Sequence, residues 1–149
     1  MATLVSSMHI FFSGIGGTAI GPLALIANQS GYEVSGSDQN PSQYINYLSK
    51  SGIKNIVIGQ SEDAIASLHH RTPIDWFVYS SALPDNHPEI NFCRKNNIKI
   101  SKRDELLNKI IDDKQLKLFA IAGTHGKTTT TAMTVWLFNS LGVPVSHSV

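Results

Sequence analysis

Short apolar runs alternate with amphipathic stretches along most of the chain. The apolar runs predict β-strands at residues 9–14, 32–38, 55–60, 75–81, 98–101 and 118–123. The amphipathic stretches predict helices at residues 18–31, 42–52, 61–68, 87–97, 102–113 and 127–142, three of which end at a glycine. Because strand and helix alternate, we expect an α/β fold with helices flanking a mostly parallel sheet.

The alternation is interrupted once, by the charged stretch "DDKQLK" at residues 112–117. We therefore predict two domains. Residues 1–113 form the first, and residues 114–149 are the start of a second α/β domain, with a strand, a glycine loop and a helix. Residues 143–149 are expected to open a further strand. On this interpretation the chain is the amino-terminal part of a longer protein.

The first glycine loop, "FFSGIGGTAIG", lies between a predicted strand and a predicted helix. Gly14, Gly16 and Gly17 allow the tight turn and the close backbone approach that a phosphate-binding loop requires. Asp38 ends the next strand, where a Rossmann-like fold places an acid against a ribose. No Lys or Arg precedes Lys50, so backbone N–H groups and a helix end must hold any anion. A turn without ligand, a dinucleotide and a UDP-sugar all remain compatible with this loop.

The second glycine loop, "GTHGKTTTT", follows the apolar run "LFAIA". It predicts a P-loop in which Lys127 reaches the β- and γ-phosphates of ATP and the hydroxyl of Thr128 binds Mg²⁺. The predicted ATP-binding residues are Gly123, Thr124, His125, Gly126, Lys127, Thr128 and Thr129. The loop departs from the common spacing because Ile121 stands where the first glycine is usual. A Gly-Lys-Thr turn that binds nothing is the alternative.

Composition narrows the classes of partner. The formal net charge is +1, and 15% of residues are charged, which argues against a nucleic acid or a membrane surface as the main partner. The lone Cys93 excludes an internal disulfide and is predicted to be a buried core residue. No two histidines have metal-ligand spacing, so we expect no structural metal. No apolar run approaches the ~20 residues of a membrane span, so we expect a cytoplasmic protein.

Several stretches together resemble the Mur ligase family, which builds the peptide of bacterial cell-wall precursors. They are "GIGGTAIGPLA", "GYEVSGSD", "YSSAL", "NHPEI", "KRDELL" and "AGTHGKTTTT", in this order. The histidine in the last stretch resembles the branch that adds L-alanine. The resemblance implies an ATP-dependent, amide-forming ligase that joins L-alanine to UDP-N-acetylmuramate through an acyl phosphate. It also implies that residues 1–149 alone bind the UDP moiety but are inactive.

The resemblance also implies roles for individual residues. Gly14, Ile15, Gly16 and Gly17 would contact the diphosphate, Ser37 and Asp38 would lie near the uridine, and Ser80, Ser81 and Ala82 would line the same crevice. Lys127 and Thr128 would serve ATP and Mg²⁺. His125 would either contact the acceptor or the γ-phosphate, or shape the loop.

Two alternative functions stay open at this stage. Gln60 follows "VIG", where the alanine-adding branch commonly has His, which leaves room for the ligase that recycles murein tripeptide onto UDP-N-acetylmuramate. A non-catalytic NAD-binding module would use Gly14–Gly17 and Asp38, but it leaves the second glycine loop unexplained. The sequence does not determine the oligomeric state or which amino acid or peptide is added.

Overall fold

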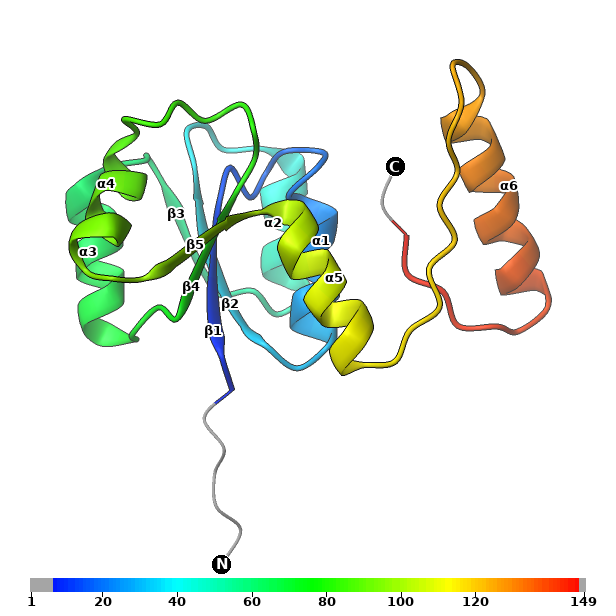
Figure 1. Cartoon of the computed structure of the whole chain (residues 1–149), viewed down its shortest axis with the longest axis horizontal. Coiled ribbons are helices and arrows are strands. Elements are labelled where there is room, and N and C mark those ends of the chain that lie inside the picture. The colour runs from blue at the N-terminus through cyan, green and yellow to red at the C-terminus, as the bar shows by residue number, and fades with distance from the viewer. Residues whose placement is uncertain (1–6, 148–149) are drawn as a thin grey trace, which may run out of the picture.

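Five parallel strands form the centre of the molecule in the order β3-β2-β1-β4-β5. A computed structural model describes residues 7–147 (Figure 1). The strands are β1 (His9–Ser13), β2 (Glu33–Asp38), β3 (Asn55–Ile58), β4 (Trp76–Tyr79) and β5 (Lys99–Lys102). Every neighbouring pair is parallel, which confirms the predicted α/β class with a parallel sheet.

Helices cover both faces of this sheet. They are α1 (Gly21–Gln29), α2 (Gln43–Lys50), α3 (Glu62–Arg71), α4 (Pro88–Lys95) and α5 (Arg103–Asp113), followed by α6 (Lys127–Ser140). Helices α1, α2 and α5 lie on one side of the sheet and α3 and α4 on the other (Figure 1). Among the described residues, no helix has the length and apolar character needed to cross a membrane.

The core consists of two clusters, one on each face of the sheet. Side chains alternate along a strand, so Ile10 and Phe12 of β1 pack with α1 and α5, whereas Phe11 packs with α3 and α4. Phe11 stacks on Phe77 of β4 with ring centroids 5.7 Å apart. Each of these side chains is buried, which fixes the register of the central strands.

The strand order reverses between β1 and β4. The chain builds outward from β1 through β2 to β3, and then crosses back to add β4 and β5 on the other side. In open parallel sheets, loops diverge at such a reversal and leave a crevice at the carboxyl ends of the strands. Residues that end β1, β2 and β4 therefore meet at one edge of the sheet.

The segment after α5 differs from its prediction. Residues 118–123 do not form the predicted strand, and most of them are exposed. A strand exists only through hydrogen bonds to a neighbouring strand, and the described residues place none beside this segment. The predicted strand at residues 143–149 is likewise absent as far as residue 147, and its last two residues lie outside the described part. The predicted helix does form as α6, where Phe119 contacts Phe138 at 5.4 Å between ring centroids.

Cys93 lies buried in α4, as predicted, and its thiol offers a test of the core. Burial, together with the nearby Glu89, raises the pKa of Cys93 to about 12. Because the thiolate is the reactive form, a disulfide reagent should modify the native protein on the order of 100-fold more slowly than the denatured protein. Spectrophotometric thiol titration measures both rates.

An exposed thiol provides the matched control for this measurement. Ser49→Cys in a Cys93→Ala background places the thiol on the exposed side of α2, where native and denatured protein should react at similar rates. Equal native reactivity of Cys93 and this exposed thiol would contradict the buried placement.

Candidate nucleotide-binding sites

The first glycine loop is held by hydrogen bonds to the end of β2. The N–H groups of Gly14 and Ile15 both donate to the carbonyl of Ser37, at 2.8 and 3.0 Å. The N–H of Gly16 donates to Oδ2 of Asp38 at 2.8 Å, and that of Gly17 donates to the carbonyl of Gly14 at 3.0 Å. Gly14 has φ +75°, a conformation that favours glycine. The loop is therefore closed on itself and on β2.

These bonds bear on the predicted contact of Gly14, Ile15, Gly16 and Gly17 with a diphosphate, which stays a prediction. The N–H groups of Gly14, Ile15, Gly16 and Gly17 are already used within the protein, and the side chain of Ile15 is buried in the core. Helix α1 begins at Gly21, later than predicted. Within the described part of the chain, the N–H groups of Thr18, Ala19 and Ile20 donate no hydrogen bond. They precede α1 and are the N–H groups available to an anion.

Asp38 shapes the loop as well as ending β2. Its Oδ2 accepts from Gly16, and its Oδ1 accepts from the N–H of Asn40 at 3.2 Å. A Cβ on Gly16 would lie 2.9 Å from that Oδ2, so the close approach requires glycine. Both carboxylate oxygens keep a lone pair free, so a contact from Asp38 to a ribose stays a prediction.

The residues after β4 lie at the same edge of the sheet, as the parallel arrangement requires. Ser80 Oγ accepts a hydrogen bond from the N–H of Ala82 at 3.3 Å, which shapes a turn. Ser81 and Ala82 are exposed, and Ser80 is half-buried. A ligand can therefore reach these three residues, and their predicted contact with one stays a prediction.

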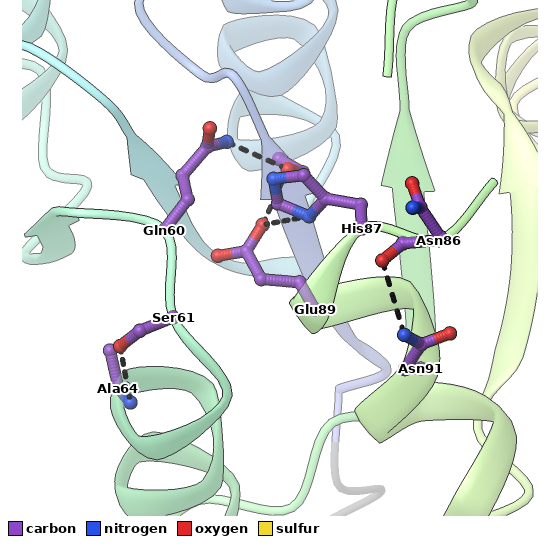
Figure 2. A network of polar contacts seen from close by, with 8 residues as sticks. Gln60, Ser61, Ala64, Asn86, His87, Glu89 and Asn91 are labelled. Carbon is purple, nitrogen blue, oxygen red and sulfur yellow. Dashed lines mark hydrogen bonds and ion pairs between the residues drawn. The ribbon is translucent and has the colours of Figure 1, made fainter. Parts of the chain in front are cut away.

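A buried polar cluster lies beside the crevice and was not predicted from the sequence. Ser13 Oγ donates to Oε2 of Glu89 at 2.5 Å, and Nε2 of Gln60 donates to Ser13 Oγ at 2.9 Å. Nδ1 of His87 lies 3.8 Å from the same Glu89 oxygen. Figure 2 shows the side chains of Gln60, His87 and Glu89 pointing toward one another from different segments. An acid in the first turn of a helix is favourable whether it is exposed or buried, so the sequence carries no sign of this burial.

Burial dominates the electrostatics of this cluster. It raises the pKa of Glu89, as does the charge of Asp38, whereas the hydroxyls of Ser13 and Ser37 lower it. Burial also lowers the pKa of His87, which favours the neutral imidazole. Ser37 Oγ is near enough to favour the ionised carboxylate, but it makes no hydrogen bond of acceptable geometry.

The second glycine loop leaves its N–H groups free. Within residues 7–147, the N–H groups of residues 124–129 donate no hydrogen bond, in contrast to the first loop. Gly126 has φ +79° and precedes α6, and Nζ of Lys127 donates to the carbonyl of Gly123 at 2.8 Å. The hydroxyl of Thr131 donates to the carbonyl of Lys127, whereas that of Thr128 has no such bond among the described residues. The arrangement can receive phosphate oxygens.

Mg²⁺ has no preformed protein site in the described residues. They bring no three His, Cys, Asp or Glu side chains together in a way that could hold a metal ion. Thr128 is exposed, and the contact of its hydroxyl with Mg²⁺ stays a prediction.

The five-stranded parallel sheet with helices on both faces and a glycine loop after β1 defines a Rossmann-like α/β protein. A model described as "Mur ligase family, catalytic domain" matches residues 9–115. The chain belongs to the Mur ligase family.

Relatives and solved structures agree with this assignment. A UDP-N-acetylmuramate–L-alanine ligase from Clostridium acetobutylicum is 41% identical over 127 residues, which cover 85% of this chain and 26% of that protein. One from Campylobacter jejuni is 34% identical, covering 91% of this chain and 29% of its own length. The UDP-N-acetylmuramate–alanine ligase structure from Thermotoga maritima has TM-score 0.79 and 32% identity, covering 91% of this chain and 30% of that one. A murein peptide ligase from Psychrobacter arcticus has TM-score 0.80 and 29% identity, covering 96% and 30%.

The buried Glu89 predicts a pH-dependent stability. Because its folded-state pKa is raised, its contribution is fully favourable below the ordinary carboxyl pKa of 4.5 and is lost as pH rises through the folded-state pKa. Across that window, the unfolding free energy of Glu89→Gln relative to wild type should rise by up to about 1.4 kcal/mol per pH unit. Urea denaturation of both proteins at a series of pH values measures the difference.

The same titration of Glu62→Gln is the control, since Glu62 is partly exposed at the start of α3 and pairs with Lys95. A difference between wild type and Glu89→Gln that stays constant with pH would contradict the assigned shift.

Proposed function

We propose that the chain is the amino-terminal part of an ATP-dependent ligase that joins L-alanine to UDP-N-acetylmuramate. Two curated relatives that carry this name are each 41% identical to it, and it spans about a quarter of their length. The observation that carries the proposal is the contrast between the two loops. The first is followed by free N–H groups and has no Lys or Arg before it in the sequence, whereas the second carries Lys127.

The first domain is assigned the UDP moiety. The free N–H groups of Thr18, Ala19 and Ile20 lie before α1, where the helix dipole favours a diphosphate. Ser37 and Asp38 end the neighbouring strand and Ser80–Ala82 follow β4, so a nucleotide along this edge meets the predicted residues. Gly14–Gly17 then act through their shape, by letting the loop turn close to β2.

The second domain, proposed to begin at residue 114, is assigned ATP. In the complete enzyme, the lactyl carboxylate of UDP-N-acetylmuramate attacks the γ-phosphorus and displaces ADP, which gives an acyl phosphate. The amine of L-alanine then attacks the acyl carbon, and phosphate leaves with the former carboxylate oxygen. Lys127 must leave the Gly123 carbonyl to contact the phosphates, where its charge offsets that of the transferring group. Mg²⁺, when bound to ATP beside Thr128, supplies further charge neutralisation.

A second candidate is the ligase that recycles murein tripeptide. The murein peptide ligase from Psychrobacter arcticus superimposes as well as the alanine ligase from Thermotoga maritima, with TM-scores of 0.80 and 0.79. Both candidates use the same acceptor and the same chemistry, so the described residues serve either. Assays of the full-length enzyme with L-alanine and with tripeptide distinguish them.

A ligand panel tests the proposed first substrate. UDP-N-acetylmuramate and UDP should raise the thermal unfolding midpoint of this chain, because a ligand that binds only the folded state stabilises it. Uridine should produce a smaller shift because it lacks the diphosphate, and NAD should produce none. Differential scanning fluorimetry at equal ligand concentrations measures all four. Stabilisation by NAD alone would favour the dinucleotide-binding module over the ligase.

Lys127→Ala tests the separation of the two sites. In the full-length enzyme it should lower ligation at least about 1000-fold, because the transferring phosphoryl group loses a cation. Binding of UDP-N-acetylmuramate, measured by calorimetry, should stay nearly unchanged. Lys117→Ala, which changes an exposed lysine just before the loop, should affect neither. A parallel loss of sugar-nucleotide binding in Lys127→Ala would show that the two loops form one site.

A further inference from the structure

The segment that carries the free N–H groups of the first domain is flanked by two glycines. Gly16 precedes residues 18–20, and Gly21, the first residue of α1, follows them. The segment lies at the ligand edge of the sheet, the edge at which β1, β2 and β4 end. Gly16, Thr18 and Tyr44 line part of a cavity of about 580 Å³, so a ligand can reach it. Whatever holds the two glycines therefore decides where the free N–H groups lie.

Helix α2 fills the space that a side chain would take at both glycines. A Cβ on Gly21 would overlap Cε1 of Tyr44, so the aromatic ring occupies that place. A Cβ on Gly16 would lie 3.0 Å from Cγ1 and 3.1 Å from Cδ1 of Ile45. Two successive side chains of α2 thus press against backbone, one at each end of the segment that carries the free N–H groups.

The first turn of α2 is itself held in place. Ser42 caps the helix, and its Oγ accepts a hydrogen bond from the N–H of Ile45 at 3.2 Å. Leu48, one turn further along, is 0% exposed and belongs to the core cluster on the α1 side of the sheet. Ile45 is also buried, and Tyr44 packs against the same cluster. Side chains fixed in this way can hold a neighbouring segment in one position.

The position of the free N–H groups matters because hydrogen bonds depend strongly on geometry. Their energy falls steeply when the donor, the hydrogen and the acceptor move out of line. A charged side chain attracts an anion over a longer distance, but no Lys or Arg occurs in the chain before Lys50. A shift of the start of α1 would therefore weaken a diphosphate at residues 18–20 more than it weakens a nucleoside.

We propose that Tyr44 and Ile45 are positioning residues for the diphosphate of the bound sugar nucleotide. They hold Gly21 and Gly16, and through these glycines they hold the N–H groups of residues 18–20 where the diphosphate binds. This role rests on the proposed function, because that function supplies the ligand. It requires the contact of each side chain with backbone, and it requires no hydrogen bond from the Tyr44 hydroxyl.

Removal of the Tyr44 ring tests the role in the full-length enzyme. Tyr44→Ala should weaken binding of UDP about 10-fold and leave uridine binding within about 2-fold, because uridine lacks the diphosphate. Tyr44→Phe keeps the ring against Gly21 and should bind both ligands as the wild type does. Tyr47→Ala is the matched control, since it makes the same change on the same helix at a tyrosine that is 51% exposed. Displacement of UDP-N-acetylmuramate in titration calorimetry measures both affinities, including a weak one.

Steady-state kinetics of the full-length enzyme give a second readout. Tyr44→Ala should raise KM for UDP-N-acetylmuramate about 10-fold and leave kcat and KM for ATP near their wild-type values. The reason is that the change weakens a contact made by the bound substrate and leaves the loop with Lys127 untouched. A loss of stability alone would lower the amount of folded enzyme without a selective change in this one KM.

Ile45→Val is the second variant, and it decides the question if Tyr44→Ala does not fold. It removes Cδ1, one of the two atoms that face Gly16, and it keeps a β-branched apolar residue in the core. We expect UDP to bind about 3-fold more weakly and uridine to bind as it does to the wild type, because only part of the contact is lost.

Four results would overturn the assignment. Wild-type UDP affinity in a folded Tyr44→Ala, or in Ile45→Val when Tyr44→Ala is unfolded, refutes the positioning role. Equal losses for UDP and uridine refute it, since the effect is then not specific to the diphosphate. A loss in Tyr44→Phe as large as in Tyr44→Ala assigns the effect to the hydroxyl and refutes it too. A wild-type enzyme that binds neither UDP-N-acetylmuramate nor UDP refutes the proposed function, and the positioning role falls with it.

Discussion

The attachment of the first glycine loop to the end of β2 organises the ligand edge of the domain. The carbonyl of Ser37 and the carboxylate of Asp38 accept three N–H groups of the loop, so β2 dictates where the chain turns into α1. That attachment requires glycine at position 16, where a side chain would meet the carboxylate. Because the N–H groups of Gly14 to Gly17 bond within the protein, the N–H groups left without a partner in the described residues are those of Thr18–Ile20. A mutation at the end of β2 would therefore change the position of these N–H groups through the loop.

The two glycine loops, both proposed to bind phosphate groups, have different electrostatic surroundings. The first relies on N–H groups and a helix end, beside the acidic side chains of Asp38 and Glu89, so an anion is tolerated only over the free N–H groups. The second offers free N–H groups together with Lys127. A diphosphate that remains intact suits the first environment. A phosphate that gains charge in a transition state suits the second, because a mobile cation can follow it.

Sequence periodicity predicted the helices and strands of the first domain because each buries one face, and that burial requires apolar residues at regular spacing. The prediction of a strand at residues 118–123 was wrong, because an apolar run forms a strand only when a neighbouring strand supplies hydrogen-bond partners. The contact of Gly14–Gly17 with a diphosphate stays a prediction, and which N–H groups of the loop are free depends on Ser37 and Asp38, which are distant in sequence. Glu89 escaped prediction because an acid in a first helical turn is favourable whether exposed or buried. Packing between segments, which no local pattern encodes, decided each of these points.

Gln60 shows how such packing changes the interpretation of a residue that departs from a family pattern. As a departure from the alanine-adding branch, it cast doubt on a contact with the sugar nucleotide. In the structure its amide donates to Ser13, which in turn donates to Glu89. Gln60 therefore helps to position the Ser13 hydroxyl that donates to Oε2 of Glu89. A histidine at this position has one donor nitrogen that can do the same, so the substitution preserves the arrangement and gives no reason to prefer the recycling ligase.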